Sequence, residues 1–285
     1  MMSKNSGSTV FITGCSTGIG YCVAHGLKKR GYRVIASARR SMDVERLQQE
    51  GLECLQLDLD RPESIQRAVQ ELADLSENRI YGLFNNAGFG QPGAVEDLSR
   101  EALRAQFETN VFGTLELTNR ILPWMRQAGE GRIIQNSSVL GFVSLAYRGA
   151  YNASKYALEG LYDTLRLELA GTDIHAILIE PGPIESRFRA NAFAAYKKNI
   201  DVEHSAHRAA YLAMENRLLK EGPAVPFTLP PEAVLDKVSR ALESKRPAPR
   251  YYVTIPTWLF GGLKRVLSSR ALDRVLLRVS GDEQP

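Results

Sequence analysis

Short runs of aliphatic and β-branched residues alternate with longer amphipathic segments along most of the chain. Six apolar runs predict strands at 9–12, 33–38, 53–57, 80–84, 132–137 and 174–180, and another is expected at 251–255. Between them we expect helices at 19–30, 43–50, 62–75, 98–127, 149–169 and 232–244. This alternation predicts an α/β fold in which a doubly wound parallel sheet has helices on both faces. No linker composition interrupts it, so we expect a single domain over residues 1–285, with its core at about 9–255.

The regular alternation ends after Pro181. Residues 183–230 show no clear period, and we expect an irregular segment beside the substrate, either a loop throughout or a loop that contains helices. An amphipathic, helical tail follows at 256–280, and four of its apolar residues share one helical face: Leu272, Val275, Leu276 and Val279. We favour docking of this C-terminal helical tail on its own domain or on a partner subunit. Contact with a membrane surface is the alternative, because the rest of the tail carries five basic residues: Lys264, Arg265, Arg270, Arg274 and Arg278.

Composition narrows the class of protein. The sequence of 285 residues is 44% hydrophobic and 24% charged, which is enough apolar material for a sizeable core. Its net charge of +4 is too small to argue for nucleic acid as a partner. Three cysteines without a CxxC motif suit a reducing compartment, and the first eight residues are polar with no signal-peptide pattern. We therefore expect a cytoplasmic protein, and we expect it to associate with copies of itself.

A glycine-rich turn joins the first expected strand to the first expected helix. It reads Thr13-Gly14-Cys15-Ser16-Thr17-Gly18-Ile19-Gly20. A pyrophosphate can approach the amides of a helix N-terminus, where the dipole favours anions, only if no side chain intervenes. A plain tight turn is the alternative for such a sequence alone, but the strand–turn–helix context favours a phosphate site. We assign cofactor contacts to Gly14, Ser16, Thr17, Gly18, Ile19 and Gly20.

Tyr151 and Lys155 are four residues apart in an expected helix and so share one face of it. Hydride transfer to a carbonyl leaves an alkoxide that needs a proton, and a phenol with a pKa of about 10 is a poor acid/base at neutral pH. A neighbouring ammonium favours the phenolate and so makes the phenol more useful. The spacing by itself is also typical of solvated helix faces.

Further motifs follow the glycine-rich turn in a fixed order: Asn85-Asn86-Ala87-Gly88, Asn110, Ser138, Tyr151-Asn152-Ala153-Ser154-Lys155 and Pro181-Gly182. Together they resemble the short-chain dehydrogenase/reductase family over about residues 9–255. The resemblance implies a Rossmann-type sheet of about seven strands and a nicotinamide cofactor at the carboxyl ends of the strands. Phe89-Gly90 and the stretch 180–188 look like the hydroxysteroid and retinol dehydrogenase branch, and they are similar to bacterial NADP-dependent aldehyde reductases of that branch.

The resemblance also implies the catalytic residues Asn110, Ser138, Tyr151 and Lys155. The separation from Tyr151 favours Ser138 over its neighbour Ser137 as the hydroxyl that hydrogen-bonds the substrate oxygen. In the family, the lysine also holds the nicotinamide ribose, and the asparagine holds a water in a proton relay. For Asn110, an ordinary polar helix residue is an equal alternative. A cofactor-sensing binding protein is the rival function, and the presence of all four residues favours an enzyme.

The end of the second strand favours NADP(H) as the cofactor. NAD-specific sites usually place a carboxylate there, and Ala38 provides none. Arg39 follows at once and can pair with a 2′-phosphate, with Thr17 nearby, although a solvated arginine is the alternative. The family places further cofactor contacts at Asp58, Asn86, Ala87, Gly88, Pro181, Ile184 and Ser186, and the last of these is a serine where the family often has threonine.

Apolar residues in the segments around the expected nicotinamide site indicate an apolar aldehyde, ketone or alcohol as substrate. We assign the substrate contacts to Ser138, Phe89, Leu140 and Phe142, although local core packing is an alternative for each apolar residue. The same segments carry Val143, Leu145, Phe188, Phe193 and Tyr196. His204 and His207 beside Glu203 have no clear further ligand, so we expect no metal site.

Overall fold

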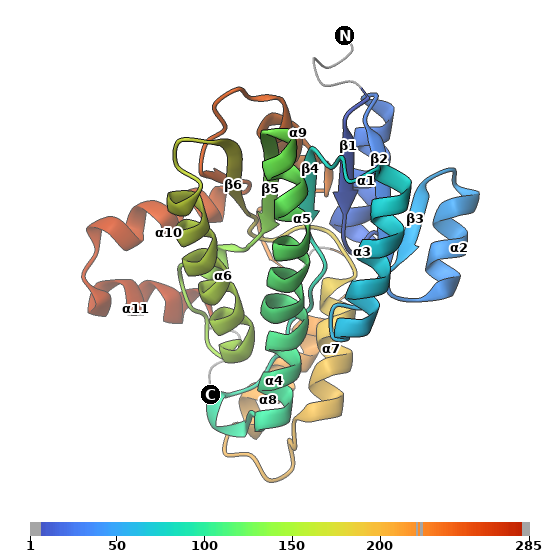
Figure 1. Cartoon of the computed structure of the whole chain (residues 1–285). Coiled ribbons are helices and arrows are strands. Elements are labelled where there is room, and N and C mark those ends of the chain that lie inside the picture. The colour runs from blue at the N-terminus through green and yellow to red at the C-terminus, as the bar shows by residue number, and fades with distance from the viewer. Residues whose placement is uncertain (1–6, 221, 223–224, 281–285) are drawn as a thin grey trace.

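The computed structural model describes residues 7–220, 222 and 225–280. The polar residues 1–6, where the sequence shows no signal-peptide pattern, lie outside this part of the chain. Seven parallel strands form one sheet in the order β3-β2-β1-β4-β5-β6-β7 (Figure 1). The strands are β1 Thr9–Ile12, β2 Arg33–Ala38, β3 Glu53–Gln56, β4 Gly82–Asn85, β5 Glu130–Asn136, β6 Asp173–Glu180 and β7 Arg250–Tyr252. This confirms the doubly wound, Rossmann-type sheet that the sequence predicts.

Helices cover both faces of the sheet. They are α1 Gly18–Lys29, α2 Ser41–Gln49, α3 Pro62–Ser76, α4 Arg100–Phe107, α5 Thr114–Ala128, α6 Gly149–Glu168, α7 Phe188–Asn199, α8 Arg208–Leu219, α9 Glu232–Glu243, α10 Ile255–Val266 and α11 Ser269–Val279. Side chains alternate across the strands, so Val10 and Ile12 pack against α1 and α9, whereas Phe11 packs against α3, α5 and α6. Both faces are therefore buried, as the nearly continuous apolar strands indicate.

Three element boundaries differ from the expected ones. The expected helix at 98–127 is divided by a π-helical segment, Glu108–Gly113, between α4 and α5. The last strand ends at Tyr252, because Pro256 stands near the start of α10 and favours a helix N-terminus there. The tail forms two helices rather than one, α10 and α11. No helix within the described residues is both long enough and apolar enough to cross a bilayer.

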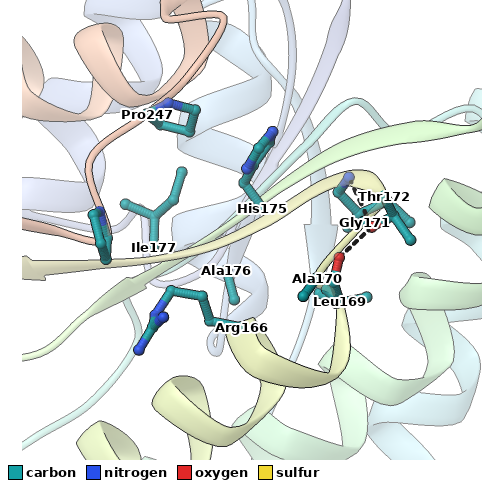
Figure 2. A pocket seen from close by; sticks show the side chains of 11 residues that line it. Arg166, Leu169, Ala170, Gly171, Thr172, His175, Ala176, Ile177 and Pro247 are labelled. Atoms are coloured by element: carbon teal, nitrogen blue, oxygen red, sulfur yellow. Dashed lines mark hydrogen bonds between the residues drawn. The ribbon is translucent and has the colours of Figure 1, made fainter.

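The carboxyl edge of the sheet carries most of the irregular segments. In Figure 1, α7 and α8 lie below that edge, and α10 and α11 lie to the side of β6 and α6. The predicted loop at 183–230 thus contains two helices, which bury Tyr196, Tyr211 and Met214 in a cluster of their own. A cavity of about 170 Å³ lies at the opposite, amino edge, beside Thr172 and His175 (Figure 2). It is remote from the sequence motifs and takes no part in the site described below.

Candidate active site

The glycine-rich turn leaves no space for side chains. Gly14 and Gly18 have φ of +71° and +61°, in the left-handed region that glycine adopts most easily. A Cβ on Gly14 would lie 2.8 Å from the Cα of Ala87, and one on Gly18 would lie 2.9 Å from the Cβ of Ser186. A Cβ on Gly20 would collide with the carbonyl oxygen of Gly14. Close packing between β1, α1 and the loop after β4 therefore requires these glycines.

Polar side chains tie the ends of three neighbouring strands together. The Thr13 hydroxyl accepts hydrogen bonds from the backbone amides of Asn86 and Ala87, at 3.0 and 2.9 Å. The Asn86 side chain donates to the carbonyls of Thr13 and Gly14 and accepts from the amide of Asn136 at 3.0 Å. Thr13 and Asn136 were not among the predicted site residues. Their signal in the sequence is a polar side chain where a buried strand ends.

The N-terminus of α1 fits a phosphate group. Thr17 is its N-cap residue, and the Thr17 side chain is exposed and makes no capping hydrogen bond. The first turn of α1 carries no acidic residue, so its amides and the positive end of the helix dipole face the turn without a competing anion. Arg46 of α2 donates to the carbonyl of Ser16 at 2.7 Å and so fixes the turn from outside. Sequence reasoning did not find Arg46.

The end of β2 presents Arg39 to solvent. Its backbone carbonyl accepts a hydrogen bond from Gln56 at 3.1 Å, whereas no partner for its guanidinium is found among the described residues. Ala38 is only 1% exposed and packs with the core under α1. Asp58 follows β3, and its carboxylate accepts from the amide of Asp60 at 3.2 Å. Arg39 is therefore placed to receive an anion at this edge.

Ser138, Tyr151 and Lys155 meet beyond the end of β5. The hydroxyl of Ser138 is hydrogen-bonded to the half-buried Tyr151 and also accepts from the amide of Leu140 at 3.1 Å. Lys155 is 5% exposed, and its Nζ lies 5.6 Å from the centre of the Tyr151 ring. This Nζ donates to the carbonyl of Asn136 at 2.7 Å. The adjacent Ser137 hydroxyl points elsewhere and donates to Glu159.

Burial dominates the protonation of this group. It raises the pKa of Tyr151 to about 12, and the hydrogen bond from Ser138 opposes this rise. It lowers the pKa of Lys155 to about 8, and the negative charge of Glu159 opposes that fall. In the protein alone, burial is the largest influence on the pKa of Tyr151, and the expected lowering of that pKa by the lysine stays a prediction. Tyr151 is therefore a neutral proton donor in this state.

Asn110 lies in the π-helical segment between α4 and α5. Its Oδ1 accepts from the amide of Phe89 at 3.1 Å, and its Nδ2 donates to the carbonyl of Phe89 at 3.0 Å and to the hydroxyl of Ser154 at 3.2 Å. A Cβ on Gly88 would lie 3.0 Å from this Oδ1. A π-helical turn is an irregularity often found at functional sites, and here it brings the amide against the loop after β4. Its role in holding a water stays a prediction.

The segment after β6 folds back over the glycine-rich turn. The carbonyl of Pro181 accepts from the amide of Val139 at 2.8 Å, which ties this segment to the Ser138 turn. Ile184 pairs with Leu229 in an isolated parallel bridge and packs on the core beneath. The Ser186 hydroxyl accepts from the amide of Phe188 at 3.3 Å, at the start of α7. Pro181, Ile184 and Ser186 thus lie at the same edge as Gly18 and Tyr151.

The apolar residues assigned to the substrate have different surroundings. The ring of Phe188 lies 5.3 Å from that of Tyr151 and edge-on to it. Phe89 is half-buried beside Asn110. Leu140 is buried with Val143 and Phe260, and Phe142 stacks on Tyr252 at 5.7 Å. The side chains Phe193 and Tyr196 belong to the separate cluster between α7 and α8.

The tail packs on its own domain. Val275 and Leu276 of α11 contact the buried cluster of Leu140, Val143 and Phe260, and Phe142 and Tyr151 border the same cluster. The amine of Lys264, which belongs to α10, donates to the carbonyl of Phe142. The tail therefore supports the loop that carries Ser138.

The histidines in the loop before α8 pair with carboxylates. His204 lies 2.8 Å from Asp201, and His207 lies 2.5 Å from Glu96. Among the described residues, no group of three or more His, Cys, Asp or Glu side chains is placed to hold a metal ion.

Comparisons with known proteins agree with this arrangement. The family model for the short chain dehydrogenases matches residues 8–197. A protein of Escherichia coli strain K12, described as the uncharacterized oxidoreductase YbbO, is 46% identical over 268 residues, which cover 94% of this chain and 93% of that protein. Human 17-beta-hydroxysteroid dehydrogenase type 1 and human retinol dehydrogenase 8 are both 32% identical, over 262 and 280 residues. The first alignment covers 87% of this chain and 77% of the relative, and the second covers 93% and 87%.

Among solved structures, a short-chain dehydrogenase from Streptomyces avermitilis is similar with a TM-score of 0.75 and 27% identity, and 98% of each chain is covered. Other solved structures of similar fold are described as complexes with NAD or NADP. The chain belongs to the short-chain dehydrogenase/reductase family, in its hydroxysteroid and retinol dehydrogenase-like branch. It is an oxidoreductase of this family that acts on CH–OH groups with a nicotinamide cofactor.

Proposed function

We propose that the protein is an NADP(H)-dependent oxidoreductase that interconverts an apolar aldehyde or ketone and the corresponding alcohol, with Tyr151 as the general acid/base. The observation that carries the proposal is the hydrogen bond between Ser138 and Tyr151 with the buried amine of Lys155 beside the same ring. These groups hold a proton next to an oxygen-binding hydroxyl, which is what a carbonyl oxygen needs when it becomes an alcohol.

The cofactor, when bound, supplies or accepts the hydride. In the reducing direction, the Ser138 hydroxyl hydrogen-bonds the carbonyl oxygen and the Tyr151 hydroxyl gives that oxygen its proton. The phenolate left on Tyr151 is stabilised by the protonated amine of Lys155. In the oxidising direction, the same phenolate accepts the proton of the alcohol. Asn110 fixes the backbone of Phe89 at the edge of this space.

Arg39 and Thr17 support NADP(H) rather than NAD(H). The exposed guanidinium of Arg39 offers planar donors to a 2′-phosphate, and the buried Ala38 places no carboxylate there. We assign the other cofactor contacts to the glycine-rich turn, to Asp58, to the 86–88 loop and to the segment from Pro181 to Ser186. All of these lie at or beyond the carboxyl ends of the strands, where Rossmann-type sheets bind nucleotides.

The phenylalanines near Tyr151 support an apolar substrate. The ring of Phe188 covers one side of Tyr151, and Phe89 follows the loop that Asn110 holds. Leu140 belongs to the buried cluster that Tyr151 and Phe142 border, so we assign Leu140 and Phe142 to shaping the wall of the substrate site. Apolar walls with a few convergent polar groups are typical of pockets for small apolar ligands.

A substrate screen tests the proposed function. NADPH oxidation should be followed with aliphatic aldehydes, aromatic aldehydes, a steroid ketone and retinal. Each substrate should also be measured with NADH as cofactor and with the Tyr151→Phe variant. We expect turnover with at least one of these classes that depends on NADPH and is lost in the variant. If NADPH binds but no class is reduced faster than by Tyr151→Phe, the chain is a cofactor-sensing binding protein and the proposal fails.

We also propose that the chain works in the cytoplasm and pairs with copies of itself rather than with a membrane. Cys15, Cys22 and Cys54 are all unpaired, as in a reducing compartment. Val275 and Leu276 of α11 pack within the molecule, whereas Val279 of the same face and Trp258 and Leu259 of α10 are more than half exposed. Sedimentation equilibrium should show more than one copy, and anionic liposomes at low salt should not sediment the protein.

A further inference from the structure

A third ionisable residue continues the catalytic face of α6. Tyr151, Lys155 and Glu159 follow one another at intervals of four residues, so their side chains share one side of the helix. Glu159 is 8% exposed, and its charge raises the pKa of the Lys155 amine against the effect of burial. Lys155 donates to the carbonyl of Asn136, which is neutral, so Glu159 is the nearest negative charge to it on α6.

Glu159 also reaches the turn that carries the substrate-binding hydroxyl. Its Oε1 accepts a hydrogen bond from the hydroxyl of Ser137, the residue next to Ser138. Gly141 of the same turn packs directly over this pair, since a Cβ there would lie 2.7 Å from the Ser137 oxygen and 2.9 Å from the Glu159 Cγ. The turn and the helix are thus joined through one carboxylate.

The other side of Glu159 faces a guanidinium and two more carboxyl groups. Arg250 of β7 donates to Glu159 at 3.1 Å, to Asp163 at 2.6 Å and to Glu180 at 3.1 Å. Glu180 is fully buried at the end of β6, and its Oε2 accepts no hydrogen bond from a donor of the described residues. Three carboxylates around one half-buried guanidinium would leave uncompensated negative charge beside the fully buried Glu180, which is costly away from water.

A proton on Glu180 removes this excess charge. Burial, and then the charge of Glu159, raise the pKa of Glu180, and a hydrogen bond joins the two carboxyl groups. Glu180 as a neutral acid donates this bond, and Glu159 keeps the negative charge. Glu159 is therefore held as a carboxylate by Arg250, Ser137 and the acid of Glu180.

We propose that Glu159 is a positioning residue of the active site: its fixed carboxylate keeps Lys155 protonated and, through Ser137, holds the turn that presents Ser138. This inference rests on the proposed function for its effect on turnover. The titratable and charged groups that face Glu159 are Lys155 and Asp163 on α6, Glu180 on β6, and Arg250 and Tyr252 on β7. Glu159 is the one carboxylate of this cluster that contacts the turn carrying Ser138.

The first test does not depend on catalysis. The titration of Lys155 should be followed by NMR of its ε-carbon in the free protein, with the signal assigned from Lys155→Met. Glu159→Gln keeps an acceptor for Ser137 and removes the charge, so the pKa of Lys155 should fall by about one unit or more. Asp163→Asn is the matched control, because Asp163 also accepts from Arg250 but lies one helical turn farther from Lys155. This variant should leave the pKa of Lys155 unchanged.

Glu180→Gln gives an independent test. Glutamine resembles the protonated acid, so Glu180→Gln alone should leave the pKa of Lys155 unchanged. In the double variant Glu159→Gln/Glu180→Gln, the pKa of Lys155 should fall further than in Glu159→Gln, because Glu180 can no longer ionise in place of Glu159. A fall in Glu180→Gln alone would mean that Glu180 carries the charge, and would overturn the assignment. So would a Lys155 titration that is the same in Glu159→Gln and wild type. If Glu159→Gln does not fold, the result for Glu180→Gln still decides which carboxyl is ionised.

Turnover provides the second readout. In Glu159→Gln the alkaline fall in the rate of carbonyl reduction should move to lower pH together with the Lys155 titration. Ser137→Ala keeps the charge of Glu159 but removes the hydrogen bond between Glu159 and the turn, so it should lower kcat without moving the pH profile. If the pKa of Lys155 shifts in Glu159→Gln but wild type reduces no carbonyl, the effect of Glu159 on Lys155 stands and only the proposed function is rejected. Equal pH profiles despite a shifted Lys155 would reject the catalytic part of the inference.

Discussion

The ring of Phe188 stands edge-on to the ring of Tyr151, with 5.3 Å between their centres and 62° between their planes. Phe188 begins α7, and Gly90 lies against both rings, since a Cβ there would be 2.7 Å from Phe188 and 3.5 Å from Tyr151. The loop after β4 and the start of α7 thus close around the phenol. We therefore expect a substrate carbonyl bound at Tyr151 to lie near Phe188.

Phe188→Ala should therefore weaken the use of large apolar substrates. Phe188 is partly exposed, so the loss should be about 1 kcal/mol, or roughly fivefold in kcat/KM, for a bulky carbonyl. A two-carbon aldehyde, which has little apolar area, should be affected less. Phe193→Ala is the control, because Phe193 lies on the same helix but packs near Tyr196. Equal losses for both variants, or for both substrates, would show that Phe188 only supports α7.

Tyr151→Phe removes only the hydroxyl of the proposed acid/base. Folding and NADPH binding should survive, and turnover should fall by about 10²-fold or more, which is the usual range for losing a general acid. Tyr156→Phe is the matched control on the same helix, since Tyr156 is exposed on another face. Steady-state kinetics on the best substrate from the screen measures both. Near-normal turnover by Tyr151→Phe would remove the assignment.

Arg39→Ala should weaken NADPH and leave NADH nearly unchanged. NADH has no phosphate for the guanidinium to hold, whereas a charge-assisted hydrogen bond to the 2′-phosphate contributes about 1.5–3 kcal/mol, or roughly 10- to 100-fold in affinity. Arg40→Ala is the neighbouring control, because Arg40 caps α2 through its backbone carbonyl. Fluorescence titration with both cofactors measures the effect. If wild type binds the two equally, or Arg39→Ala weakens both alike, the preference for NADP(H) is wrong.

The local periodicities of the sequence were sufficient to predict the sheet and the shared face of Tyr151 and Lys155. Val10, Phe11 and Ile12 are all apolar because both faces of β1 are buried, and an interval of four places side chains together on any α-helix. The same interval leads from Lys155 to Glu159. That residue could have been found by extending the pattern one turn further.

Contacts between distant segments could not be predicted in this way. Arg250 and Glu159 are 91 residues apart, and they meet only because β6 and β7 pair beside α6. The π-helical turn at Asn110 has no distinctive local pattern, since its hydrogen bonds are to Phe89 and Ser154 on other segments. The edge-on ring of Phe188 likewise depends on how the aperiodic segment after β6 folds back.

The pH dependence of carbonyl reduction should report Lys155. The pKa of this amine is about 8, and its neutral form no longer stabilises the phenolate that proton donation leaves on Tyr151. The rate should therefore be highest below this pKa and should fall as the pH rises through about 8. Lys155→Arg stays protonated over this range, so its remaining activity should lack the fall. An unchanged alkaline limb in Lys155→Arg would assign the fall to another group.

The docking of α11 gives the last prediction. Val275 and Leu276 pack against the buried cluster of Leu140, Val143 and Phe260, and Tyr151 and Phe142 border the same cluster. Replacing Val275 and Leu276 by Asp would place two carboxylates against apolar side chains, so the free energy of unfolding should fall by about 2 kcal/mol or more, and kcat should fall with it. Leu277→Asp is the control, because Leu277 is 50% exposed on the other side of the same helix and should tolerate a charge. Urea unfolding and steady-state kinetics should be run on both. If the double variant matches Leu277→Asp in both measurements, α11 does not support the site, and its apolar face is available to another partner.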